Sequence, residues 1–131
     1  MKPKGLSSII HSATDADTFE IKGPMGKGLD IQPTGTHIAF TAGTGCLVFV
    51  DLVAYLIRKN LGATNFKENK TKDNFKFILY VSFPSRDEGI AIELCESLKQ
   101  LCDKKGINNF DFYLRISKQS QERWDHDFLH R

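Results

Sequence analysis

The chain has 131 residues, of which 40% are hydrophobic and 11% aromatic, enough apolar side chain for the core of one domain. Its 18 lysine and arginine residues oppose 16 aspartate and glutamate residues, which leaves a net charge of +2. Both signs are interleaved and no basic run could follow a nucleic-acid backbone, so we expect no nucleic-acid partner.

The first long apolar stretch covers residues 37–59, HIAFTAGTGCLVFVDLVAYLIRK, and contains a Gly-Thr-Gly sequence. A single helix across the stretch would have the length to span a membrane. It would also bury Asp51 in hydrocarbon, at a cost of roughly 2.5–3.5 kcal/mol. We instead predict a strand over 37–41, a glycine turn, and a helix over 46–59 that ends at Gly62.

A second apolar run, FKFILYVSF over 75–83, is rich in aromatic and β-branched residues. This composition predicts a strand covered on both faces of a parallel sheet. The turn PSRDEG follows, in which Pro84 ends the strand and Asp87 or Glu88 is expected to cap the next helix.

Helical spacing returns in the next segment and predicts an amphipathic helix followed by a third strand. Cys95 and Cys102 lie two turns apart on one face, where we interpret them as small buried hydrophobic residues. The third strand is expected within NFDFYLRIS, over 109–117. The helix is expected to have apolar positions Ile90, Leu94, Leu98 and Leu101 and to end at Lys104, Lys105 and Gly106.

The order of these elements, β-α-β-α-β, predicts an α/β fold with a parallel sheet in a three-layer α/β/α, Rossmann-like arrangement. Ligands of such folds bind at the carboxyl ends of strands, here the loops TAGTGC and FPSRDEG. Glycine in the first loop would let backbone N–H groups approach a pyrophosphate, next to the positive end of a helix. A tight turn also needs glycine for steric reasons alone, so both interpretations stay open.

Two further stretches carry a family resemblance. The sequence FEIKGPMGKGL, over 19–29, and the later HIAFTAGTG resemble the junction and NAD(P)-binding domain of the ferredoxin–NADP reductase superfamily, closest to cytochrome b5 reductases. In the upstream KGLSSII, Gly5, Leu6 and Ser7 match the segment that contacts the FAD pyrophosphate, and DADTFEIKGP matches the last strand of the flavin barrel. The matching turn residues are Gly23, Pro24 and Gly26 at the junction, and Ala42, Gly43, Thr44 and Gly45 in the dinucleotide loop.

The chain departs from the family pattern in several places. Ala42 replaces the first glycine of the loop, and Val48 stands where the family has proline. The Arg-x-Tyr-Ser/Thr flavin motif and the Cys-Gly-Pro strand have no counterpart. The resemblance therefore implies an incomplete NAD(P)-binding domain over 23–131 that lacks its C-terminal strand, preceded over 1–22 by the end of a flavin domain.

The resemblance implies hydride transfer from NAD(P)H to FAD, then electron transfer to a haem, iron–sulfur or quinone acceptor, with no catalytic side chain from this chain. The N–H groups of Gly45 and Cys46 would contact the pyrophosphate, and the Thr44 hydroxyl would lie near the nicotinamide. Ser85 and Arg86 would meet the adenosine ribose. Arg86 there favours NADPH, whereas the adjacent carboxylates favour NADH, so the choice stays open.

The resemblance also implies that a flavin domain outside this chain binds most of the FAD, so we expect the isolated chain to be inactive. Its first strand would be an open sheet edge that favours self-association. Two alternatives stay open. The chain could be a non-catalytic nucleotide-fold module for partner binding or regulation, or a flavodoxin-like fold whose glycines match by coincidence.

The remaining polar residues predict no further site. The cysteines are odd in number and lack CxxC spacing, which argues against a disulfide framework and a zinc site. His126 and His130 have no third ligand nearby, so we expect no metal, and Trp124 and Phe128 are expected to anchor the tail. We expect a reducing compartment, cytoplasmic or organellar, and a protein that is soluble or peripheral to a membrane.

Overall fold

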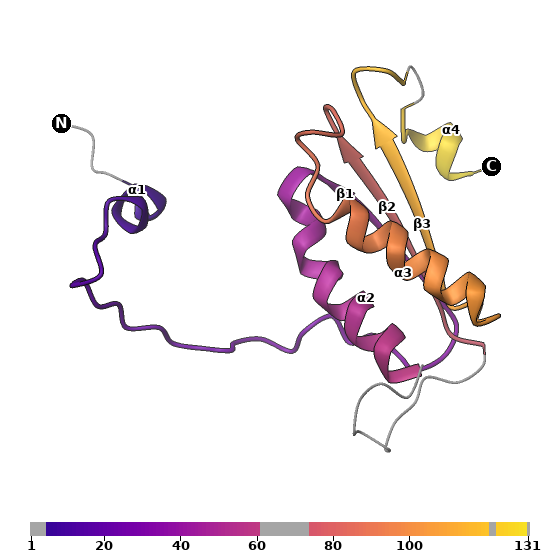
Figure 1. Cartoon of the computed structure of the whole chain (residues 1–131), viewed down its shortest axis with the longest axis horizontal. Coiled ribbons are helices and arrows are strands. Elements are labelled where there is room, and N and C mark those ends of the chain that lie inside the picture. Colours follow the sequence, from indigo (N-terminus) through magenta and orange to yellow (C-terminus); the bar gives the residue numbers. More distant parts are fainter. Residues whose placement is uncertain (1–4, 61–73, 121–122, 131) are drawn as a thin grey trace. The chain divides into compact units, whose positions relative to one another are not determined.

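A computed structural model describes residues 5–60, 74–120 and 123–130 of the chain (Figure 1). Two compact units are distinguished, Met1–Asp30 and Ile31–Arg131, and each is described by itself. The domain boundary after residue 22 stays a prediction.

The first unit has one short helix, α1 (Leu6–His11), which buries none of its residues. After a turn in which the amide of Thr14 donates to the Asp17 carboxylate (2.7 Å), residues 18–25 have no regular secondary structure. The barrel strand expected in this stretch is therefore not formed in the described chain. The physical reason is that a strand needs a partner to satisfy its backbone groups.

The second unit contains a three-stranded parallel sheet of β1 (Thr36–Ala42), β2 (Lys76–Phe83) and β3 (Phe110–Ile116), in the order β1-β2-β3. The connections are α2 (Leu47–Asn60), preceded by the 3-10 turn η1 (Gly43–Cys46), and α3 (Ile92–Lys104). The predicted alternation of strands and helices is confirmed. Gly62, the predicted end of the first helix, lies outside the described residues.

Both long helices cover the same face of the sheet (Figure 1). The strand order advances in one direction, so right-handed crossovers place α2 and α3 on one side. The second helical layer of the predicted three-layer arrangement is missing from the described residues. Among the described residues of this unit, the one helix on the opposite face, here called the open face, is the four-residue α4 (His126–Leu129).

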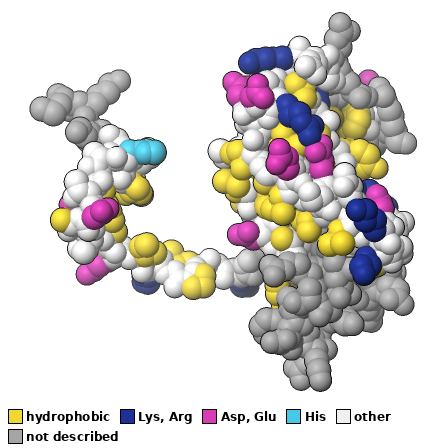
Figure 2. All heavy atoms as spheres, in the orientation of Figure 1, with side chains coloured by type: hydrophobic (Ala, Val, Ile, Leu, Met, Phe, Trp, Pro, Cys, Tyr) yellow, Lys and Arg dark blue, Asp and Glu magenta, His cyan; other side chains and the backbone are white. Residues whose placement is uncertain are grey.

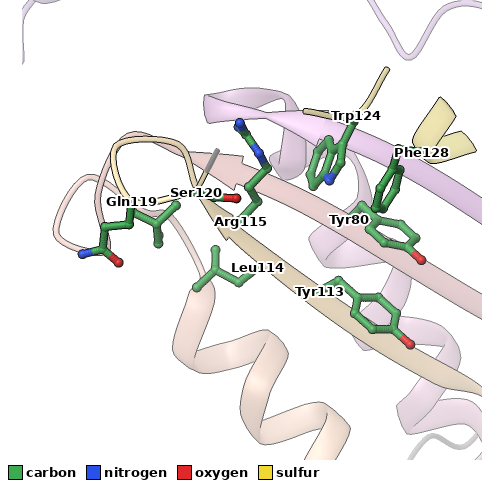
Figure 3. A pocket seen from close by; sticks show the side chains of 9 residues that line it. Tyr80, Tyr113, Leu114, Arg115, Gln119, Ser120, Trp124 and Phe128 are labelled. Atoms are coloured by element: carbon green, nitrogen blue, oxygen red, sulfur yellow. The ribbon is translucent and has the colours of Figure 1, made fainter. Parts of the chain in front are cut away.

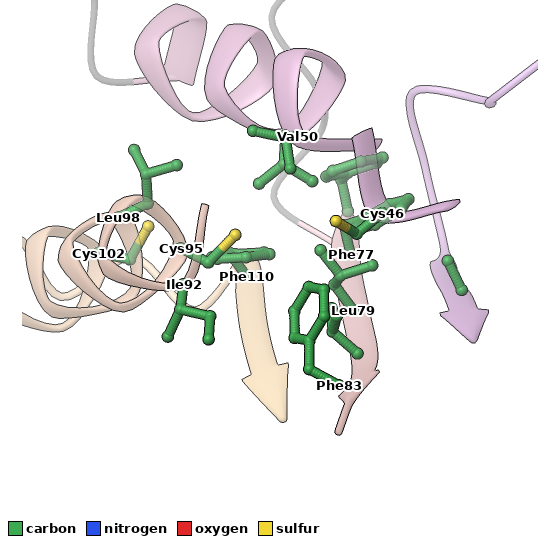
Figure 4. Packing of buried hydrophobic residues seen from close by; sticks show 14 residues of the cluster. Cys46, Val50, Phe77, Leu79, Phe83, Ile92, Cys95, Leu98, Cys102 and Phe110 are labelled. Carbon is green, nitrogen blue, oxygen red and sulfur yellow. The ribbon is translucent and has the colours of Figure 1, made fainter. Parts of the chain in front are cut away.

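The core lies between the helices and the inward side of β2 (Figure 4). Side chains along β2 alternate between buried and half-buried, as expected of a strand whose two faces differ. Val50 points from α2 and Cys95 from α3 toward the strands (Figure 4). The largest fully buried side chains are Phe75, Phe83, Phe110, Leu79, Val53, Val81, Cys46 and Cys102.

The buried face of α3 differs from the predicted one. Leu94 is 44% exposed and Leu101 is 37% exposed, although both were expected in the core. The face that packs inward instead consists of Ile92, Cys95, Leu98 and Cys102. The expected burial of the two α3 cysteines is thus confirmed. The buried apolar face, however, lies at a different angle around the helix axis from the predicted one.

The two ends of α3 are capped in different ways. Ala91 occupies the N-cap position in the left-handed conformation and makes no side-chain cap. The prediction that Asp87 or Glu88 caps this helix is therefore wrong. The C-terminal prediction is confirmed, because Gly106 follows the helix at φ +66° and its amide donates to the Asp103 carbonyl.

Helix α2 leaves part of its apolar surface uncovered. Leu47, Val48 and Tyr55 are between 43% and 61% exposed. Hydrophobic side chains accordingly gather on the visible surface over the two helices (Figure 2). No helix in the described part of the chain has the length and apolar character needed to cross a membrane.

A row of aromatic rings crosses the open face. Phe40 stacks on Tyr80 with ring centroids 4.6 Å apart, and Tyr80 stacks on Tyr113 at 4.7 Å. Trp124 and Phe128 from the C-terminal segment meet this row edge-on. The expectation that these two residues anchor the tail is confirmed.

Strand β1 is an edge strand, as predicted, since it pairs only with β2 within the described residues. Its sequence, THIAFTA, contains no charged residue and no proline. β3, at the other edge, carries Asp111 and Arg115. Charged side chains protect an edge from pairing with another chain, and β1 lacks this protection. Self-association through β1 stays a prediction.

Asp111 on β3 lies in an ion-pair cluster. Its carboxylate contacts the Lys76 ammonium at 2.5 Å and the Lys99 ammonium at 3.1 Å. Desolvation acts to raise the pKa of Asp111, but hydrogen bonds and charge from the two lysines outweigh it and lower the pKa. Asp111 therefore stabilises the fold at neutral pH, and this contribution is lost as the pH falls through its lowered pKa.

We expect Asp111→Asn to reduce the free energy of unfolding at pH 7 by about 1 kcal/mol, the upper range for a partly exposed pair. The difference from wild type should shrink as the pH falls below about 4. The matched control is Asp103→Asn, because Asp103 also pairs with Lys99 (2.6 Å) but is 58% exposed. Urea unfolding at several pH values measures both. A loss that is independent of pH would contradict the ionic role.

Candidate functional site

The carboxyl ends of the three parallel strands meet at one edge of the sheet. Ala42, Ser82 and Arg115 form a register row there, on the open face. The turn η1 leaves this edge after β1, and residues 84–91 leave it after β2. Both loops predicted to bind the dinucleotide therefore lie where α/β folds place their ligands.

The first loop is the tight turn η1. Gly43 has φ +54°, a conformation that costs side-chain-bearing residues free energy, so the turn itself requires this glycine. Gly45 lies outside the left-handed region, and a Cβ placed on it meets no heavy atom of the described structure within 4 Å. Thr44 and Gly45 are exposed. In a 3-10 segment each amide donates to the carbonyl three residues earlier, so the amides without an acceptor inside η1 are those of its first residues, Gly43 and Thr44.

Cys46, the last residue of η1, has a buried side chain. The thiol is buried at 1% exposure, with Sγ 3.9 Å from the Ile90 carbonyl oxygen. Desolvation by burial raises the pKa of Cys46. A buried neutral thiol is a poor nucleophile, and the predicted role of the Cys46 amide stays a prediction.

The two predicted ligand contacts of the second loop, Ser85 and Arg86, already have partners within the protein. Ser85 donates its hydroxyl hydrogen to the Glu88 carboxylate (3.2 Å) and accepts the Glu88 amide (3.4 Å). Arg86 pairs with Glu96 of α3 at 2.6 Å, and this hydrogen bond, with its charge, raises the pKa of Arg86. The guanidinium expected to hold a 2′-phosphate therefore has a carboxylate partner already.

Two hollows lie at this edge of the sheet, and they share Arg115 and Trp124. Figure 3 shows the side chains that line the larger one. The larger hollow has a volume of about 570 Å³ and extends along the aromatic row to Tyr113 and Phe128. The smaller one, of about 480 Å³, reaches Ala42, Ser82 and Arg123. Sequence reasoning missed this region, although alternation along FDFYLRI places Tyr113 and Arg115 on one face.

The residues predicted to contact FAD lie in the first unit. Gly5 is the N-cap of α1, and Leu6 and Ser7 form its first turn. The junction residues Gly23, Pro24 and Gly26 lie in irregular chain of the same unit. These roles stay predictions.

Comparison with models of known protein families gave no match, and no curated protein and no solved structure matches the chain.

Proposed function

We propose that this chain binds NAD(P)H at the carboxyl end of its sheet, as the NAD(P)H-binding domain of an FAD-dependent oxidoreductase. Electrons would pass from the flavin to a haem, iron–sulfur or quinone acceptor. The architecture supports this proposal at a coarse level, because a parallel β-α-β-α-β unit presents two loops at one sheet edge. The Rossmann-like and ferredoxin-reductase-like parts of the fold prediction belong to this proposal.

The main support for the proposal is the presence of glycine at position 45. The turn conformation explains Gly43, but neither backbone strain nor packing in the described structure requires a glycine at 45. A ligand that approaches the backbone closely does require one, because a side chain there would occupy its space. The positive end of the helical segment, at its first residues, suits an anion such as a pyrophosphate.

Each residue of the turn has a distinct role in this proposal. The Gly45 and Cys46 amides, which donate within η1 in the free protein, would donate to the pyrophosphate instead, and the N-terminal end of the helical segment favours its negative charge. The exposed Thr44 hydroxyl orients the nicotinamide half. The bound nicotinamide supplies a hydride for FAD, which requires flavin-binding protein in addition to the sheet unit.

The choice between NADH and NADPH depends on which anion pairs with Arg86, the Glu96 carboxylate or the 2′-phosphate of NADPH. To bind a 2′-phosphate, the Arg86 guanidinium must leave Glu96. We expect Glu96→Gln, which removes the competing carboxylate, to strengthen NADPH binding about fivefold and to leave NADH binding unchanged. Arg86→Ala should remove any preference for NADPH. Calorimetric titration measures all four affinities, and equal changes for both cofactors would contradict this role for Arg86.

The alternative is a non-catalytic module that uses the nucleotide fold to bind a partner. The ion pair between Arg86 and Glu96 favours the partner-binding module, because Arg86 and Ser85 of the second loop already pair with carboxylates of the protein. Calorimetry with NADH and NADPH on the wild-type chain separates the two functions. Saturable binding of either dinucleotide supports the proposal, and no heat of binding at millimolar ligand favours the module.

A further inference from the structure

The edge strand β1 has the properties of a surface that pairs with an identical strand. We propose that a second copy of this chain binds at β1, in antiparallel register, so that the two sheets become one continuous sheet. A two-fold axis would pass between the two copies of Ala39. This inference goes beyond the proposed function and does not depend on it, because the dinucleotide is assigned to η1, which begins after β1 ends.

β1 is the more exposed of the two edge strands (Figure 1). Its residues on the open face, Thr36, Ile38, Phe40 and Ala42, are all exposed. In β3, by contrast, Tyr113 is the one exposed residue. An edge strand directs backbone N–H and C=O groups away from its neighbour, and these groups can pair with the strand of another chain. The exposure of β1 therefore leaves room for a strand beside it.

Antiparallel pairing matches the apolar residues of β1 with each other. A two-fold axis perpendicular to the sheet keeps both open faces on one side, so residues directly opposite each other share a face. Ala39 is the middle of the seven residues of β1, and a register centred on it pairs the strand over its full length. Ile38 then lies opposite Phe40 of the second copy, and Phe40 opposite Ile38. Their exposed fractions, 56% and 43%, would fall as these side chains leave water.

The polar character of β1 is compatible with this pairing. The strand contains no charged residue, so no like charges come to lie opposite each other. On the face toward the helices, the Thr41 hydroxyl donates to the Tyr80 carbonyl at 3.1 Å. The His37 imidazole lies 3.0 Å from the Thr34 carbonyl oxygen. These two side chains thus keep partners within their own copy when a second strand is added.

The interface would consist mainly of one pair of short strands. Such a pairing is small beside a standard interface of about 1,600 Å², so we expect a reversible dimer that depends on concentration. Sedimentation equilibrium of the full chain measures this directly. The mass should rise with concentration from 14.8 kDa toward twice that value. A chain that stays monomeric at millimolar concentration would overturn the proposal.

A lysine on the open face of β1 tests the surface. Ile38→Lys places a charge opposite Phe40 of the second copy and should weaken the dimer at least about tenfold. The matched control is Leu129→Lys, because Leu129 on α4 is also 56% exposed but lies outside β1. The control should associate as wild type does. Dimerisation that Ile38→Lys preserves would overturn the proposal.

Engineered cysteines test the register independently. Thr36 would lie opposite Ala42 of the second copy, and both positions are exposed. Thr36→Cys/Ala42→Cys should form a disulfide-linked dimer under mild oxidation, because directly opposite Cβ atoms are about 4.5–5.5 Å apart. Each single variant should stay unlinked, since identical positions are then roughly 20 Å apart. The three native cysteines are buried and should not cross-link. No cross-link in the double variant, or equal cross-linking in a single variant, would overturn the proposal.

Discussion

Leu79→Ala is expected to lower the free energy of unfolding by about 3–5 kcal/mol. Leu79 lies in the central strand β2 and is completely buried, with an exposed fraction of 0%. Truncation removes its apolar contacts and leaves a cavity beneath both helices, which the rigid sheet cannot fill. A domain of this size has only about 5–15 kcal/mol of stability, so a large share of it would be lost. Urea unfolding followed by circular dichroism measures the change.

The matched control for this change is Leu94→Ala on α3. The chemistry is identical, but Leu94 is 44% exposed, so we expect a loss below about 1 kcal/mol. If Leu79→Ala proves unfolded in buffer, that result agrees with the prediction, and Leu79→Val then gives a smaller measurable loss. Equal losses at positions 79 and 94 would show that the core is not where the structure places it.

Gly45→Val is expected to abolish dinucleotide binding while leaving the fold intact. A Cβ at position 45 meets no described heavy atom within 4 Å, so we expect the free energy of unfolding to change by less than about 1 kcal/mol. The same side chain would stand where a pyrophosphate meets the backbone amides. Calorimetry should show at least about a tenfold loss of affinity for NADH.

Gly5→Val provides the matched control for that experiment. Gly5 has φ −65° and equally open surroundings, and it belongs to the first unit. Its predicted role concerns FAD, so NADH affinity should equal that of wild type. Gly45→Ala adds one carbon and should fall between wild type and Gly45→Val. Wild-type affinity in Gly45→Val would remove the observation on which the proposed function depends.

Local pattern was enough to predict the order of the elements. Apolar runs with β-branched and aromatic residues predicted β1 and β2, and Gly106 marked the end of α3, because these signals arise within one element. The residues within one element could not show which other segments cover each face of the sheet. The run in β2 suggested helices on both sides, whereas Tyr80 on its outer face is packed by Phe40, Tyr113 and Trp124.

The candidate site was predicted only where it depends on the turn itself. Gly43 and Gly45 could be selected because glycine at a strand-to-helix turn has a local reason. The partner of Arg86 could not be predicted, since Glu96 lies ten residues later on another element and meets it only in the fold. Arg115 was missed for a similar reason, because the hollow around it also needs Trp124 from the C-terminal segment.

Amide chemical-shift mapping with NADH tests the central claim most directly. The proposed function predicts that NADH shifts the amides of residues 42–47, led by Gly45 and Cys46, with smaller shifts over 83–88 at the second loop. The Gly45→Val spectrum should show no such shifts under the same conditions. NADH-dependent shifts that avoid both loops, or that persist in Gly45→Val, would contradict the proposal that this turn binds the dinucleotide.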